Sequence, residues 1–178
     1  MAACRRAAMK FLIGIVGAMA LAVGHGAAAK EYFIGGQLHE RDMQIFANYL
    51  IGPELTPMAP DMPTGADVIH LEADIHATGY SVHGYPDGGW IPYLTVQYTL
   101  QKLDTSWKAT GDLRPMTAKD GPHYGYNIKM NGPGHYHLVL RISPPEGNGF
   151  LRHTDMLTGV PDWWKPFSVA FEFIYPQE

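Results

Sequence analysis

The most telling absence in this chain of 178 residues is cysteine, which occurs only once, at position 4. Cys4 lies in a region with the pattern of an export signal, in which a basic start precedes the apolar run of residues 11–23 and three alanines at 27–29. We therefore expect residues 1–29 to be a signal peptide that is cleaved near Ala29. The exported chain then has no cysteine, which excludes disulfides and thiolate metal ligands.

The chain also lacks a long hydrophobic run and an excess of basic residues. The run at 11–23 is shorter than the roughly 20 apolar residues that span a bilayer, so no membrane segment is expected after cleavage. Cleavage removes three of the 13 basic residues and none of the 17 acidic ones, which leaves a net charge of −7. That charge argues against a nucleic-acid partner and favours cations. The remaining residues 30–178 match the size of one domain.

No segment shows a sustained helical period, whereas short runs with strand-like composition alternate with Gly/Pro/Asn/Asp turns. The strand-like runs are residues 44–50, 66–77, 90–103, 107–116, 124–130, 135–142 and 166–175. About seven short strands with regular turns are typical of an antiparallel sandwich. We therefore predict an all-β fold, an immunoglobulin-like antiparallel β-sandwich.

The segment VIHLEADIHA, residues 68–77, alternates strictly between apolar and polar side chains. In a strand, the apolar set would enter a core and the polar set would line up on the other face. That polar face carries His70, Glu72, Asp74 and His76. Such a row suits a metal better than a catalytic triad, although an ordinary solvated strand face has the same pattern.

Three further residues with metal-binding side chains stand in turn-rich segments, namely Met116, His123 and His153. If these met His70 and Glu72, the site would combine three imidazoles, a thioether and a carboxylate. A thioether favours copper, while the missing cysteine excludes a blue-copper centre. From the residues alone, a methionine such as Met116 is more often a core gap-filler than a ligand, and His123 after Gly-Pro also fits a residue that caps a turn.

Five segments together resemble the Tp34/P19 family of periplasmic iron-uptake proteins, which includes the FtrA/FetP-like components of ferrous-iron transport systems. The segments are HLEADIHA (70–77), WIPYLTVQYTL (90–100), PMTAKDGPHYGYNIKM (115–130), RHTDMLTGV (152–160) and WWKPF (163–167). The resemblance is collinear over nearly all of the exported chain and is poorest over residues 35–64. It implies an immunoglobulin-like sandwich, a homodimer and a periplasmic location.

The resemblance also implies which residues hold metals. The copper ligands of the family fall on His70, Glu72, Met116, His123 and His153. Its acidic iron cluster falls on Glu72, Asp120 and Glu31, so Glu72 would serve both metals.

The function implied is copper-dependent participation in high-affinity iron uptake, with iron delivered to an inner-membrane FTR1-like permease. Two alternatives are a copper-dependent ferroxidase and a periplasmic copper-binding or detoxification protein. A metal-free module that binds a protein or glycan through surface aromatics is a further alternative.

Overall fold

The computed structural model describes residues 30–177, so the predicted signal peptide lies outside the described part. Within that part the chain forms nine strands and one short 3-10 helix, η1 (Pro145–Asn148). The strands are β1 (Glu31–Phe33), β2 (Leu38–Glu40), β3 (Met43–Ile51), β4 (Val68–Ala77), β5 (Thr95–Lys102), β6 (Lys108–Ala118), β7 (Gly121–Lys129), β8 (Gly134–Ser143) and β9 (Phe167–Tyr175). Every pairing between them is antiparallel. None of the described residues belongs to a helix long and apolar enough to cross a membrane.

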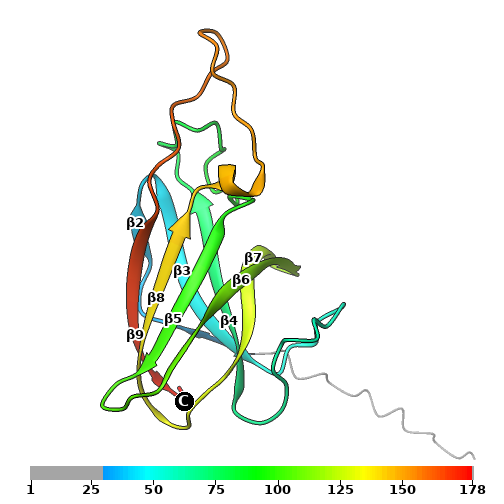
Figure 1. The fold of residues 1–178 in the computed structure, drawn as a ribbon, viewed down its shortest axis with the longest axis vertical. Coiled ribbons are helices and arrows are strands. Elements are labelled where there is room, and N and C mark those ends of the chain that lie inside the picture. The colour runs from blue at the N-terminus through cyan, green and yellow to red at the C-terminus, as the bar shows by residue number, and fades with distance from the viewer. Residues whose placement is uncertain (1–29, 178) are drawn as a thin grey trace, which may run out of the picture.

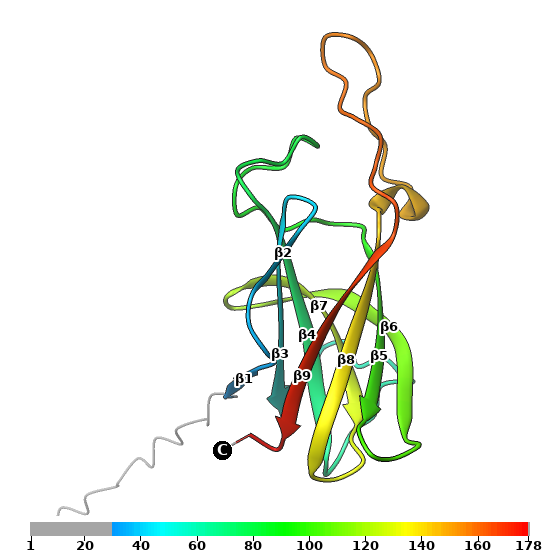
Figure 2. The ribbon, with the colours of Figure 1, turned by 90° about the vertical axis from the view of Figure 1, so that its left-hand side faces the viewer.

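The strands follow one hydrogen-bonded path, β1-β3-β4-β7-β6-β5-β8-β9, with β2 added beside β3. The path folds into two layers at β6, whose first half pairs with β5 and whose second half pairs with β7. The change of partner falls between Leu113 and Arg114, next to Pro115, which has no N–H to donate. Figures 1 and 2 show β5, β8 and β9 facing β3, β4 and β7 across the molecule. This arrangement confirms the antiparallel sandwich.

The core lies between the two layers and is built from the alternation that the sequence shows. On β4, Ile69, Leu71, Ala73 and Ile75 are fully buried, and on β5 the buried set is Val96, Tyr98 and Leu100. These side chains belong to one continuous apolar cluster. The register of β4 is therefore fixed, because a slip by one residue would turn its polar set into the core.

One predicted strand is clearly longer than the observed one, and two short observed strands were not predicted. Residues 90–103 were expected as one strand, but β5 begins only at Thr95. Tyr93 has a left-handed backbone, with φ of 63°, which interrupts the extended chain after the single bridge between Trp90 and His76. The three-residue strands β1 and β2 had no recognisable pattern in the sequence. Both lie along β3, and β1 carries Glu31.

Loops extend from both ends of the sandwich. Residues 149–166 form a long loop that rises well beyond the strands after η1 (Figure 1, Figure 2). At the other end, residues 52–67 connect β3 to β4 and are tied to β6 and β7. Arg114 donates to the Asp61 carboxylate at 3.0 Å, and the Tyr126 hydroxyl donates to the Asp61 carbonyl at 2.7 Å.

Candidate metal centre

A buried cluster of two histidines and one glutamate lies where β4 and β7 pair. His70 and Glu72 are two residues apart on β4, so their side chains share one face. In the β4–β7 register, Asn127 pairs with His70 and Gly125 pairs with Glu72. His123 is two residues before Gly125 on β7 and therefore projects from that same face.

The donor atoms of this cluster converge. The Nε2 atoms of His70 and His123 lie 3.5 and 3.2 Å from Oε1 of Glu72, and the three donor atoms all lie within 4.8 Å of one another. Their residues are 2%, 7% and 4% exposed for His70, Glu72 and His123. Ligands bound at about 2.0–2.2 Å around one ion are separated by about 3.3–3.5 Å. The cluster thus has the spacing of a metal site.

Two details of the packing show that a metal ion fits here. Both Nε2 atoms are buried and form no hydrogen bond, although buried polar atoms nearly always have a partner. In addition, a Cβ atom at Gly125 would stand 2.6 Å from the His70 Nε2 and 3.1 Å from the Met116 Sδ. A glycine is therefore required for the imidazole and the thioether to approach the same point.

Met116 reaches the cluster from β6, where it pairs with His123 of β7. Cross-strand partners point to the same face of a sheet, and the contact geometry at Gly125 places the Met116 sulfur beside the His70 ring. The sequence-predicted residues His70, Glu72, Met116 and His123 are thus brought together. The donor set is borderline to soft, which suits copper better than a hard cation.

Burial controls the protonation of the cluster. It raises the pKa of Glu72 to about 8, and the nearby carboxylates of Asp74, Glu31 and Asp120 add to the effect. Burial also lowers the pKa of His70, and proximity of His123 acts in the same direction. At neutral pH the imidazole of His70 keeps a free lone pair, while the metal-free Glu72 holds a proton that a bound cation would displace.

An acidic pocket of about 250 Å³ adjoins this cluster. Glu31 on β1, Asp74 on β4 and Asp120 at the β6–β7 turn line it together with His76 and Asn48. Burial raises the pKa of Glu31, and a hydrogen bond with the Asp120 carboxyl group contributes to the rise. The residues predicted for iron, Glu31, Glu72 and Asp120, therefore lie within electrostatic reach of one another.

Asp74 belongs to the same acidic pocket and was not among the residues predicted for iron. Asn48 donates to its carboxylate at 3.2 Å. The alternation of residues 68–77 places Asp74 on the same face as Glu72, and that pattern is the signal that could have found it.

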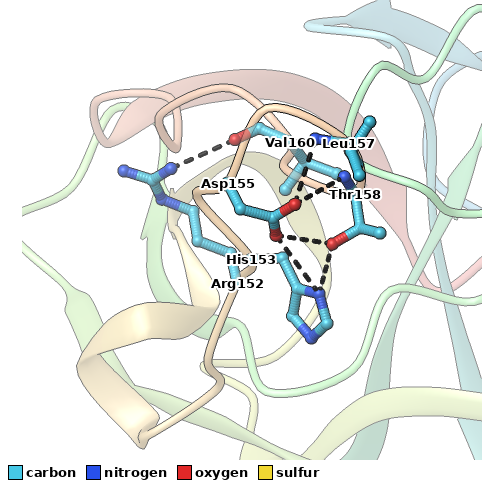
Figure 3. Close-up of polar contacts among 6 residues, drawn as sticks. All are labelled: Arg152, His153, Asp155, Leu157, Thr158 and Val160. Carbon is cyan, nitrogen blue, oxygen red and sulfur yellow. Dashed lines mark hydrogen bonds and ion pairs between the residues drawn. The ribbon is translucent and has the colours of Figure 1, made fainter.

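His153 is not part of the cluster in this structure. It lies on the long loop after η1, and its side chain is 75% exposed. Its Nδ1 contacts the Thr158 hydroxyl at 2.8 Å, and the Asp155 carboxylate accepts the backbone N–H groups of Leu157 and Thr158 (Figure 3). Arg152 donates to the Val160 carbonyl at 3.1 Å. These contacts hold the loop in a defined shape that presents His153 to the surroundings.

Sequence reasoning missed two residues of this site, Gly125 and Asn127. Both follow His123 at spacings of two and four along β7, so the three residues share one strand face. The signal is the pattern His-x-Gly-x-Asn in the segment HYGYN, residues 123–127. In a strand, this spacing places a small residue and an amide residue on the same face as a histidine.

Sequence comparison relates this chain to a family of metal-transport proteins, in agreement with the metal-binding geometry of the cluster. Residues 28–176 match the family described as Fe2+ transport protein. The chain is 44% identical over 160 residues to a UPF0423 protein of Brucella abortus, covering 88% of each chain. It is 34% identical to the 34 kDa membrane antigen of Treponema pallidum, covering 85% of this chain and 79% of that protein.

Solved structures with similar folds include metal-bound proteins. A copper-bound variant of FetP from uropathogenic Escherichia coli strain F11 superposes with a TM-score of 0.79 at 46% identity, covering 83% of this chain and 98% of that one. A copper-bound variant of P19 from Campylobacter jejuni gives 0.79 at 44% identity with the same coverage. The extent of these matches shows that the chain belongs to the Fe2+ transport protein family, the family of Tp34 and P19.

Proposed function

We propose that this protein is a periplasmic copper-binding protein of high-affinity iron uptake, which captures iron and delivers it to an inner-membrane FTR1-like permease. The observation that carries the proposal is the buried cluster of His70, Glu72 and His123 directly beside an acidic pocket. The copper-bound FetP and P19 structures support copper as the ion of the cluster.

Each residue of the cluster has a role in this proposal. His70, His123 and Met116 supply two imidazole nitrogens and a thioether, and Glu72 supplies a carboxylate that faces both metals. Copper bound there would supply a redox-active centre, because mixed imidazole and thioether donors can support both Cu(I) and Cu(II). Iron is the cargo, held by the carboxylates of Glu72, Asp120 and Glu31, which suit a harder cation.

His153 enters the proposal through a second copy of the chain. Its loop extends beyond the strands of its own sandwich (Figure 1) and leaves its side chain exposed, yet its imidazole is of the type that the site uses. We place the His153 of one protomer at the copper site of the other in a homodimer. The site would then have five protein ligands.

The test is a pair of metal titrations by isothermal calorimetry, one with Cu(II) and one with Mn(II) as a surrogate for Fe(II). Wild type should bind copper tightly at near one equivalent, and Met116→Ala and Glu72→Ala should each weaken that binding by about tenfold or more. Mn(II) binding should depend on Glu72 and be unchanged in Met116→Ala. His135→Ala removes an exposed imidazole outside the cluster and serves as the matched control.

Copper binding that survives in both variants would reject the assigned ligands, and no copper binding by wild type would reject the function. In the source organism, loss of the protein should impair growth under iron limitation. Copper sensitivity with normal growth under iron limitation would favour detoxification instead.

The shared position of Glu72 also favours a second candidate, a copper-dependent ferroxidase. Copper held by His70, Glu72, Met116 and His123 would supply a one-electron acceptor for iron(II), with dioxygen as the terminal oxidant. Iron oxidation under oxygen that exceeds one equivalent per copper and disappears in Met116→Ala would support an enzyme. Oxidation that stops at one equivalent would support capture and delivery without turnover.

A further inference from the structure

Asn127 is buried beside the cluster but offers no donor to the metal. It is 6% exposed and stands opposite His70 in the β4–β7 pairing. Its Oδ1 lies 2.7 Å from the Nδ1 of His70, and its Nδ2 donates to the carbonyl of Pro63 at 3.0 Å. The amide therefore connects a ligand of the cluster to the loop formed by residues 52–67.

The bond to Pro63 decides which way the amide faces. A carbonyl oxygen only accepts hydrogen bonds, so the NH₂ group of Asn127 must point toward Pro63. If the amide were reversed, its Oδ1 would face the Pro63 carbonyl oxygen, and two acceptors would meet without a proton between them. The Oδ1 of Asn127 consequently faces His70, and since this oxygen only accepts, the proton of that bond belongs to the Nδ1 of His70.

With the proton on Nδ1, the lone pair of neutral His70 is on Nε2. This is the buried nitrogen that has no hydrogen bond and that lies 3.5 Å from Oε1 of Glu72. A ring nitrogen that donates to an acceptor fixes both the tautomer and the orientation of the opposite nitrogen. Asn127 thus aims the lone pair of His70 at the point where the other donors converge.

We propose that Asn127 is a positioning residue for the copper site, which holds His70 in the Nδ1–H tautomer with Nε2 directed at the metal. The proposal rests on the proposed copper function and adds a residue to it. Asn127 acts through His70 and does not touch the ion.

The loop that orients Asn127 is itself fixed by contacts that do not involve His70. Asp61, two residues before Pro63, is held by Arg114 on β6 and by the Tyr126 hydroxyl on β7. Tyr126→Phe removes one of these contacts and leaves the amide and the imidazole untouched. This variant separates the effect of a loosened loop from the effect of the missing acceptor.

The experiment compares Asn127→Leu, Asn127→Asp and Tyr126→Phe with wild type. Copper affinity is measured by competition with a chelator, the Cu(II) site by absorption and electron paramagnetic resonance spectra, and folding by thermal unfolding of the metal-free proteins. Asn127→Leu should weaken copper binding about 10- to 100-fold, the range for lost partners of ligating histidines. Asn127→Asp keeps the acceptor for the His70 Nδ1–H but loses the donor to the Pro63 carbonyl, so its copper affinity should fall less than that of Asn127→Leu.

The spectra report positioning directly. The charged acceptor in Asn127→Asp makes His70 a stronger donor, so the Cu(II) spectrum should shift at equal loading. Tyr126→Phe should keep the affinity and the spectrum of wild type.

Three outcomes would overturn the inference while wild type still binds copper. They are an unchanged affinity in folded Asn127→Leu, a wild-type spectrum in Asn127→Asp, or an equal loss of affinity in Tyr126→Phe. If Asn127→Leu does not fold, the spectrum of Asn127→Asp decides. Failure of wild type to bind copper would overturn the proposed function and this inference with it.

Discussion

At the scale of single residues, Gly125 decides whether the donors can meet. A methyl group there would stand 2.6 Å from the His70 Nε2 and 2.9 Å from its Cε1. Both distances are too short for non-bonded heavy atoms, so the neighbouring side chain would have to move. The atoms it would meet belong to the side chains of His70 and Met116, not to the backbone. The sheet has no need of this glycine, but the site does.

We therefore predict that Gly125→Ala folds normally and loses copper affinity by about tenfold or more, because His70 and Met116 must move apart. Chelator competition measures the affinity, and thermal unfolding of the metal-free protein checks the fold. Gly147→Ala is the control, because a Cβ there meets nothing within 4 Å. Wild-type copper affinity in Gly125→Ala would contradict the convergence of the two side chains.

Glu72 links the stability of the metal-free protein to pH. Its pKa is about 8 in the folded chain against an ordinary value of 4.5, so between these values the folded state binds more protons than the unfolded state. Its contribution to the free energy of unfolding is therefore lost as pH rises from about 4.5 to 8, at up to about 1.4 kcal/mol per pH unit. Glu72→Gln should abolish this slope.

Urea unfolding of metal-free wild type and Glu72→Gln at pH 5, 6, 7 and 8 measures the difference. The pKa of His70, which burial lowers, acts oppositely because its stabilisation is lost as pH falls below about 6.5. That contribution is present in both proteins, so the comparison isolates Glu72. Equal slopes in the two proteins would show that the carboxyl group is ionised in the folded state.

At the scale of elements, the alternation in residues 68–77 made β4 predictable, and with it the common face of His70 and Glu72. The approach of His123 was not predictable from spacing, because it depends on β4 pairing with β7, more than 40 residues away along the chain. Residue type singled out His123 and Met116 as candidates and the resemblance to a family assigned them as ligands, whereas the structure supplies the pairing that brings them together.

The elements that escaped prediction lack the usual sequence signals. β1 and β2 have three residues each, too few for a period. The turn between β2 and β3 uses Arg41 and Asp42, both with positive φ, where Gly or Asn is the usual signal. Glu31 reaches the acidic pocket only because β1 pairs with β3.

The β6–β7 turn and β1 each contribute a carboxylate to the acidic pocket beside β3 and β4, which gives a prediction for Asp120. Asp120→Asn should weaken Mn(II) binding by about tenfold, because it removes a carboxylate that faces Glu31 and Glu72. Copper affinity should stay within about threefold, since Asp120 is not among the clustered donors. Parallel titrations of the two metals check this, with Asp87→Asn as a control outside the pocket. Equal losses for both metals would mean that the two sites are not separate.

At the scale of the whole molecule, the loop of residues 149–166 is the feature that a single copy does not explain. Its tip carries Met156 and Leu157, which are 100% and 93% exposed, and Leu151 is 88% exposed. Apolar side chains at such exposure favour burial against another surface. Together with the outward His153, they favour a role for this loop in contact between two copies.

In a two-fold dimer each loop would reach the site of the other protomer, and this leads to a prediction by complementation. His153→Ala and His123→Ala should each bind copper weakly alone. When the two variants are co-expressed, a mixed dimer has one site that combines an intact cluster with an intact His153, so about a quarter of all sites should regain tight binding.

Sedimentation establishes the dimer, and copper titration counts the sites. If mixing restores nothing and His153→Ala alone binds like wild type, His153 has no part in the site of either protomer. Recovery of tight sites requires instead that one chain supplies what the other lacks, because neither variant has a complete set of ligands.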